Sequence, residues 1–213
     1  EKIISIINQK GGVGKTTTVI NLAAGLSLQG KKVLVIDLDP QGNATTGLGL
    51  SNLANSEKSI YSVLNGTKKI SDVIEKTNFD NLDLITSNVD LSGLEVETAG
   101  DNKRAFILKD QIMAYLNDSR GVYTHILIDC PPSLSLLTIM ALVASDSLLV
   151  PLQTEFFALE GVTQLMKTIE RIKNNLNRDL SIRGILLTMY DKRNKLSGQV
   201  EREARNYFKE KVY

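Results

Sequence analysis

The stretch Lys10-Gly11-Gly12-Val13-Gly14-Lys15-Thr16-Thr17 decides the fold of this 213-residue chain. It follows a short apolar run at 3–7 and precedes a segment at 16–29 whose apolar residues recur at helical spacing, ended by Gly30. A glycine-rich turn between a buried strand and a helix is the context that a phosphate-binding loop requires. The stretch therefore predicts a strand, a phosphate-binding loop and a helix, in that order.

Each part of this loop answers a negative charge on a nucleotide. Glycines let backbone N–H groups approach phosphate oxygens, and the helix N-terminus adds its positive end. Lys15 would reach the β and γ phosphates, and Thr16 would offer its hydroxyl to Mg²⁺. A tight turn without a ligand is the alternative, and GKTT directly after a strand argues against it. The predicted nucleotide-binding residues of the loop are Gly11, Gly12, Val13, Gly14, Lys15, Thr16 and Thr17.

The loop departs from the usual pattern at one position. The pattern G-x-x-x-x-G-K-[ST] places glycine at position 9, where this chain has Gln9, and Lys10 follows it. A second lysine five residues before Lys15 is hard to satisfy on the same phosphates. Lys10 is therefore either a solvated loop charge or a group that reaches across a dimer interface.

The rest of the chain alternates between strands and helices. Short Ile/Leu/Val-rich runs predict strands at 32–36, 82–85, 124–128, 147–150 and 182–188, and helical periodicity is clearest at 106–117, 134–144, 159–175 and 196–209. This alternation predicts an α/β fold of the P-loop NTPase type, a mostly parallel twisted sheet with helices on both faces.

Domain organisation follows from what interrupts this alternation. Residues 41–80 begin rich in Gly, Asn, Ser and Thr, which predicts an insertion or mobile flap. No linker is long enough to separate two domains, so we expect residues 1–213 to be a single ATPase domain. The ending Lys211-Val212-Tyr213 resembles a strand just beginning, and we expect a C-terminal segment to be lacking.

Composition excludes several classes of protein. Lys and Arg number 25 against 24 Asp and Glu, so the chain as a whole is not strongly basic. One Cys and one His cannot form a structural zinc site in a monomer, and a lone Cys is typical of a reducing cytoplasm. The longest apolar stretch, 136–144, is far shorter than the ~20 residues of a membrane span.

Three aspartates lie where predicted strands end. Asp37 and Asp39 follow the second strand, and Asp129 follows the strand at 124–128. Parallel strands bring their carboxyl ends to one edge of the sheet, which is where the phosphate loop lies. Carboxylates there can hold Mg²⁺ or orient a water molecule for attack on the γ phosphate. For Asp37 a strand-end cap and a direct role both remain open.

Several segments together resemble one known family. The KGGVGKTT loop resembles the deviant Walker A loop of the ParA/MinD ATPases. The stretches VIDLDPQGN (35–43), ILIDCPPS (126–133), ALEG (158–161) and LTMYD (187–191) are similar to the ParA/Soj partition subfamily. The resemblance implies a slow ATPase that uses ATP and Mg²⁺ and forms an ATP-sandwich homodimer. It implies catalytic roles for Lys10, Lys15 and Asp39, with Lys10 contacting the nucleotide of the other subunit, and metal-binding roles for Thr16, Asp39 and Asp129.

The last quarter of the chain is basic. Residues 165–213 hold 12 Lys or Arg and 6 Asp or Glu, whereas residues 1–164 hold 13 and 18. Clustered cations suit phosphate contacts that carry no base readout, although a solvated helix face is the alternative for each residue. By resemblance, Arg193 aligns with a basic residue that the family uses for non-specific DNA binding. Lys192 and Lys195 are further candidates, and Met189 is a candidate to pack near the adenine.

The resemblance implies a partition function with several partners. We expect an ATP-state dimer on non-specific double-stranded DNA, reset by hydrolysis that a ParB/Spo0J-like centromere-binding protein stimulates. Such a cycle would segregate chromosome or plasmid DNA and make the protein cytoplasmic and nucleoid-associated, with no membrane contact. The alternative is a MinD-like membrane-cycling ATPase in division-site placement. A nucleotide-binding repressor without turnover also stays open, whereas an iron–sulfur reductase is excluded by the single Cys.

Overall fold

The computed structural model describes residues 2–54, 57–119 and 122–213. Within them a seven-stranded sheet has the order β3-β4-β2-β5-β1-β6-β7. Only the β3–β4 pair is antiparallel among the pairings of these strands. The strands are β1 (Lys2–Ile6), β2 (Val33–Asp37), β3 (Ile74–Lys76), β4 (Leu82–Ile85), β5 (His125–Asp129), β6 (Ser147–Gln153) and β7 (Ser181–Thr188).

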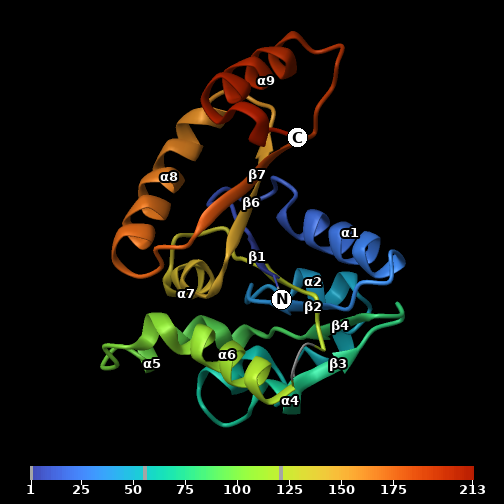
Figure 1. Cartoon of the computed structure of the whole chain (residues 1–213), viewed down its shortest axis with the longest axis vertical. Helices are drawn as coiled ribbons and strands as arrows, with labels where there is room; N and C mark the ends of the chain where they lie inside the picture. The colour runs from blue at the N-terminus through green and yellow to red at the C-terminus, as the bar shows by residue number, and fades with distance from the viewer. Residues whose placement is uncertain (1, 55–56, 120–121) are drawn as a thin grey trace.

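Helices cover both faces of this sheet (Figure 1). The helices are α1 (Lys15–Leu28), α2 (Asn43–Gly47), α3 (Ile60–Leu64), α4 (Ile70–Val73), α5 (Leu94–Glu97), α6 (Ile107–Ser119), α7 (Leu136–Ala144), α8 (Ala158–Asn175) and α9 (Lys195–Phe208). Side chains alternate along the fully buried β2. Val33 and Val35 pack with Val19 of α1, while Leu34 and Ile36 join the larger core formed with α6 to α9. This arrangement confirms the predicted fold class.

The predicted elements agree with the observed ones in order and type. All six predicted strands are present, and β6 extends three residues beyond the predicted end. No helix in the described ranges has both the length and the apolar character needed to cross a membrane.

The prediction of an insertion or mobile flap at 41–80 is wrong for the part that the structure describes. This part contains α2, α3, α4 and the antiparallel edge strand β3, and it contributes Ala44, Ile60, Val63 and Val73 to the buried core. Its helices are four or five residues long, so each one spans little more than a single turn and shows no clear helical period. Residues 55–56 lie outside the described residues.

The parallel register brings three chain segments to one edge of the sheet. Ile6 of β1 and Asp37 of β2 both pair with Asp129 of β5, so these strands end at the same level. The phosphate loop follows β1, and Asp39 follows β2. His125 begins β5 at the opposite edge, where it takes no part in this cluster.

Candidate nucleotide-binding site

The loop between β1 and α1 has a backbone shape that glycine makes possible. Gly12 and Gly14 have φ angles of +72° and +93°, in the left-handed region that L side chains rarely adopt. Gly14 is the N-cap of α1 and supplies no side-chain cap. The positive end of α1 therefore opens directly onto the loop, as an anion-binding site requires.

Lys15 lies buried beneath this loop. Its side-chain Nζ donates a hydrogen bond of 2.6 Å to the backbone oxygen of Lys10, and the residue is 7% exposed. Burial lowers the pKa of Lys15, while the nearby carboxylates of Asp129 and Asp39 raise it in opposition. The site thus holds a partly desolvated ammonium close to two carboxylates, ready to serve as the counter-charge of a phosphate group.

Asp129 combines full burial with an unsatisfied oxygen. Its Oδ2 accepts a 2.8 Å hydrogen bond from the Thr16 hydroxyl, whereas Oδ1 has no hydrogen-bond partner among the described residues. Burial raises the pKa of Asp129 to about 7, and the charge of Asp37 adds to this rise against the opposing Thr16 hydrogen bond. A buried carboxylate oxygen without a partner, next to a hydroxyl, is a donor set that fits Mg²⁺, which binds few protein oxygens and completes its shell with phosphate and water.

Asp37 and Asp39 shape the turn after β2. Asp39 is 6% exposed, and its Oδ1 accepts from the backbone N–H of Gln41 at 3.0 Å. Asp37 accepts from the backbone N–H of Asp39 at 3.2 Å, and from the N–H and hydroxyl of Thr45 at 2.8 and 2.7 Å. Burial raises the pKa of Asp37 to about 6. Both oxygens of Asp37 are thus used within the turn, which favours the strand-end role for Asp37.

Lys10 forms an ion pair with Glu155, which follows β6. Sequence reasoning did not single out Glu155, because no local spacing connects residues so far apart in the chain. The pair lies in a cavity of about 640 Å³ beside the loop, together with Val13, Phe156 and Phe157. Both phenylalanines are largely exposed.

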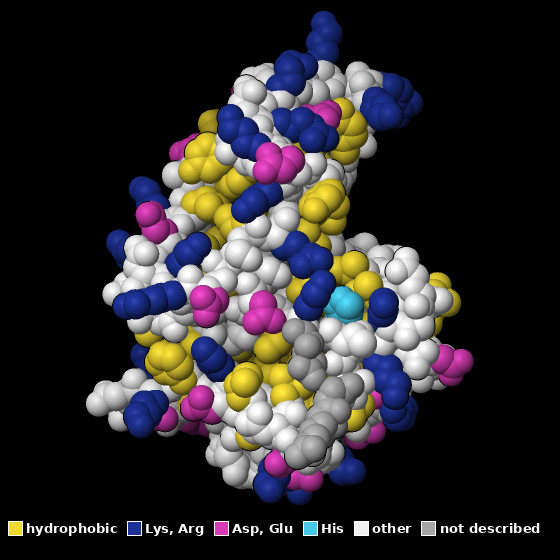
Figure 2. All heavy atoms as spheres, in the orientation of Figure 1, with side chains coloured by type: hydrophobic (Ala, Val, Ile, Leu, Met, Phe, Trp, Pro, Cys, Tyr) yellow, Lys and Arg dark blue, Asp and Glu magenta, His cyan; other side chains and the backbone are white. Residues whose placement is uncertain are grey.

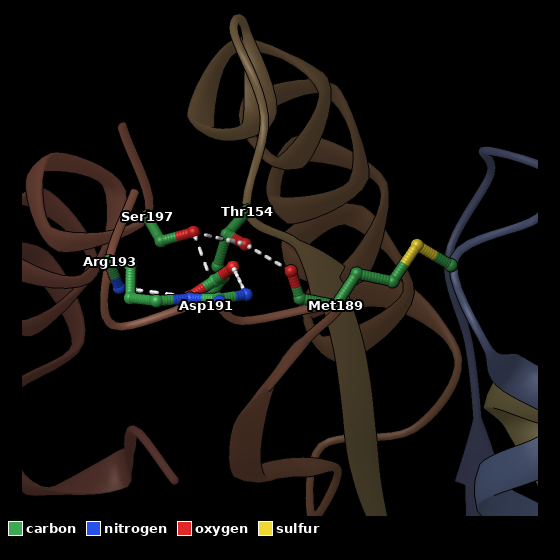
Figure 3. A network of polar contacts seen from close by, with 5 residues as sticks. All are labelled: Thr154, Met189, Asp191, Arg193 and Ser197. Carbon is green, nitrogen blue, oxygen red and sulfur yellow. Dashed lines mark hydrogen bonds and ion pairs between the residues drawn. The ribbon is translucent and has the colours of Figure 1, made fainter. Parts of the chain in front are cut away.

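The end of β7 approaches the loop from the other side. The Thr188 hydroxyl donates to the backbone oxygen of Val13 at 2.8 Å. Met189 has a φ angle of +53°, and its backbone oxygen accepts a 3.0 Å hydrogen bond from the Thr154 hydroxyl. The exposed Met189 side chain points towards the N-terminal part of the chain (Figure 3). This position suits a contact with a nucleotide base, which stays a prediction.

The three DNA-binding candidates lie close together in the chain, from the turn after β7 to the first residue of α9. Lys192, Arg193 and Lys195 are all exposed. Arg193 forms a two-pronged ion pair with Asp191, through Nε at 3.0 Å and Nη2 at 2.9 Å. Asp191 is tied in turn to the buried Ser197, whose hydroxyl accepts from the Asp191 backbone N–H and contacts the Thr154 hydroxyl (Figure 3). Lys and Arg side chains gather over the part of the surface formed by α8, β7 and α9 (Figure 2).

Comparison with known proteins places this arrangement in a family. A family model described as an AAA domain matches residues 1–182. The chain is 50% identical over 212 residues to the chromosome partitioning protein ParA of Caulobacter vibrioides, covering all of this chain and 78% of that protein. It is 49% identical over 212 residues to the sporulation initiation inhibitor protein Soj of Bacillus subtilis, covering all of this chain and 82% of that protein. The chain belongs to the ParA/Soj family of chromosome-partitioning ATPases.

A solved structure resembles this ParA/Soj chain closely in fold. A cobyrinic acid a,c-diamide synthase from Mycobacterium smegmatis, with bound ADP and magnesium, matches with a TM-score of 0.89 at 36% identity. The match covers 98% of this chain and 82% of that one. The predicted family and fold class are therefore confirmed.

Within the ParA/Soj fold, the predicted site residues fall into two groups. Lys15, Thr16, Asp39 and Asp129 converge at one edge of the sheet, next to the glycines of the loop. Lys10 is paired with Glu155. The basic candidates around Arg193 form the second group, at the turn after β7. The individual roles of all these residues stay predictions.

Proposed function

We propose that this ParA/Soj chain binds ATP with Mg²⁺ at the loop between β1 and α1, and that its ATP-bound homodimer holds non-specific double-stranded DNA. The observation that carries the proposal is the convergence of Lys15, Thr16, Asp39 and Asp129 at one sheet edge, with a buried Asp129 oxygen left without a partner among the described residues. A polyphosphate would neutralise the buried ammonium of such a cluster, and its cation would neutralise the buried carboxylates.

Nucleotide binding would use the groups that the loop already orients. The backbone N–H groups of residues 11–17 and the end of α1 would face the phosphates, and Lys15 would exchange the carbonyl of Lys10 for phosphate oxygens. The candidates to hold Mg²⁺ are Thr16, Asp129 and Asp39. Held there, Mg²⁺ would supply positive charge that offsets the charge of the phosphates.

Hydrolysis would depend on Asp39. Its carboxylate accepts a hydrogen bond from the backbone N–H of Gln41, and the backbone N–H of Asp39 donates to the Asp37 carboxylate. In this position the Asp39 carboxylate would accept a hydrogen bond from the attacking water. The water oxygen would bond to the γ phosphorus while the bond from that phosphorus to the β–γ bridging oxygen breaks, giving ADP and phosphate. Lys10 of a second subunit would contact the same nucleotide, so a complete site would need two chains.

DNA binding would use the basic surface around Arg193, Lys192 and Lys195. The excess of cations in residues 165–213 supports contacts with phosphates rather than with base edges. A ParB/Spo0J-like centromere-binding partner would stimulate hydrolysis and release the dimer from DNA. The proposed protein is thus cytoplasmic and nucleoid-associated, and its cycle segregates chromosome or plasmid DNA.

The experiment that tests this function is binding to a non-specific DNA duplex with ATP, with ADP and without nucleotide, over a range of salt concentrations. Anionic liposomes serve as the parallel surface. We expect DNA binding that requires ATP and weakens steeply with salt. Binding to liposomes but not to DNA would contradict the proposal and favour the MinD-like alternative.

A further inference from the structure

Glu155 and Lys10 lie on two neighbouring segments, the one that follows β6 and the one that follows β1. β1 and β6 are parallel neighbours, so the segments that follow them emerge at the same edge of the sheet. The Asn8 side chain connects these segments, because its Nδ2 donates to the backbone oxygen of Pro151 and its Oδ1 accepts from the backbone N–H of Lys10. The backbone N–H of Glu155 donates to the oxygen of Gln153. These hydrogen bonds position the backbone on both sides of the ion pair.

The ammonium groups of both loop lysines have interaction partners within the same chain. Lys15 donates to the backbone oxygen of Lys10, and the Lys10 ammonium pairs with Glu155. This pairing conflicts with the role of Lys10 in the proposed function. There the Lys10 side chain must release Glu155 and contact a nucleotide that is bound by the other subunit. Something must therefore hold Lys10 in the single subunit and let it go in the dimer.

We propose that Glu155 is a positioning residue that holds Lys10 on its own subunit until a second ATP-bound subunit offers its phosphates instead. The proposal rests on the proposed function. The ion pair is half open to water, with side chains 52% and 31% exposed, so it is weak and exchanges readily for a more highly charged partner. Removing it should make the dimer easier to form.

The surroundings of the pair fit a surface that a second subunit covers. Phe156 and Phe157 follow Glu155 directly and are 73% and 79% exposed. Phe157 also adopts a left-handed backbone with φ of +63°, which is uncommon for a bulky residue. Adjacent exposed aromatic residues are typical of a contact surface.

The chain offers a matched control for the test. Glu160 lines the same cavity and is exposed, but no ion pair joins it to Lys10 in the described residues. Glu155→Gln and Glu160→Gln each remove one negative charge from this surface. Only the first removes the charge that holds Lys10.

The experiment measures the dimer dissociation constant by sedimentation, with a non-hydrolysable ATP analogue and Mg²⁺, at low and high salt. We expect Glu155→Gln to tighten the dimer by about two- to fivefold, because neither subunit then has to break a weak ion pair when the dimer forms. We expect Glu160→Gln to match the wild type. The advantage of Glu155→Gln should shrink at high salt, since salt screens an exposed pair. Damage to the fold would weaken the dimer, so it cannot imitate this result.

Two outcomes would overturn the inference, and they differ in meaning. If the wild-type chain dimerises with the analogue but Glu155→Gln dimerises equally well or less well, Glu155 does not hold Lys10 back. If the wild-type chain stays monomeric with the analogue and with ATP, the proposed sandwich dimer is wrong, and the inference that rests on it is wrong too.

Discussion

Two functional regions of this protein are built differently. One is the sheet edge next to the phosphate loop, and the other is the basic surface around Arg193. At the edge, Asp129 and Asp37 are fully buried, and the Asp129 Oδ1 atom has no hydrogen-bond partner among the described residues. At the surface, Arg193 is 91% exposed and paired with its own neighbour Asp191. Function at the edge should therefore depend on individual groups, whereas function at the surface should depend on the sum of many weak ones.

The largest expected effect is loss of the buried ammonium at the edge. Lys15→Gln should weaken ATP binding by about a hundredfold or more, because several charge-assisted hydrogen bonds to phosphate disappear together. Isothermal titration with MgATP measures this, with the exposed Lys103→Gln as the control. An unchanged ATP affinity in Lys15→Gln would show that the loop does not bind the phosphates of ATP.

Loss of Asp39 separates binding from turnover at the same edge. Asp39→Ala should lower the ATP hydrolysis rate by about a hundredfold, since a group that orients the attacking water typically contributes this much. ATP-dependent dimerisation should persist, because Lys15 and the loop are intact. Steady-state phosphate release and sedimentation measure the two properties, and hydrolysis at the parental rate would assign the water to another residue.

The buried charge of Asp129 should appear as pH-dependent stability. Its folded-state pKa of about 7 lies above the ordinary value of 3.8, so the folded chain holds a proton that the unfolded chain has already lost between these values. This contribution to stability is present below pH 4 and is lost as the pH rises towards 7. Asp129→Asn should therefore raise the Tm of the nucleotide-free chain by about 2 to 8 °C at pH 8.

At pH 5 the same substitution should raise the Tm by well under half as much as at pH 8, because the unfolded carboxyl is then ionised while the folded Asp129 is still protonated, and only part of the pH-dependent loss of stability has developed. Differential scanning fluorimetry of both chains at the two pH values tests this difference. A lower Tm for Asp129→Asn at pH 8 would show that the carboxylate is already compensated in the nucleotide-free chain.

The smallest expected effect belongs to the surface. Arg193→Ala should weaken ATP-dependent DNA binding by a few fold and reduce the salt slope by roughly one for each phosphate that is no longer neutralised. Asp191→Asn should strengthen DNA binding, because it frees the Arg193 guanidinium. Fluorescence anisotropy over a salt series measures both, with Lys103→Ala as the control. A change in DNA affinity of the same size in the control would mean that only total charge matters.

The two regions also differ in how far the sequence predicts them. The loop is predictable because Gly12 and Gly14 encode its backbone directly, and the positions of Asp39 and Asp129 follow from strands that end together. The antiparallel β3 and the short helices at 43–73 escape prediction because each is too short to show a period. The pairing of Lys10 with Glu155 depends on two distant loops, so it is visible only once the sheet order is known.

The basic surface marks a different limit of sequence reasoning. Charge counts locate an excess of cations in residues 165–213, but they do not show which of these cations are occupied. Arg205 donates to Glu201 and to the backbone oxygen of Val212, and Arg193 is paired with Asp191. These local partners are set by side-chain conformations at an exposed surface, where no burial pattern constrains them.

The proposed function requires that ATP hydrolysis at the buried edge controls DNA binding at the exposed surface. The most direct test is the residence time of the protein on a non-specific DNA duplex after ATP is added and then removed, for the wild type and Asp39→Ala. We expect the wild type to leave DNA at the rate at which it hydrolyses ATP, and Asp39→Ala to remain bound many times longer. Equal residence times for the two proteins would show that hydrolysis at the buried edge does not control release from DNA.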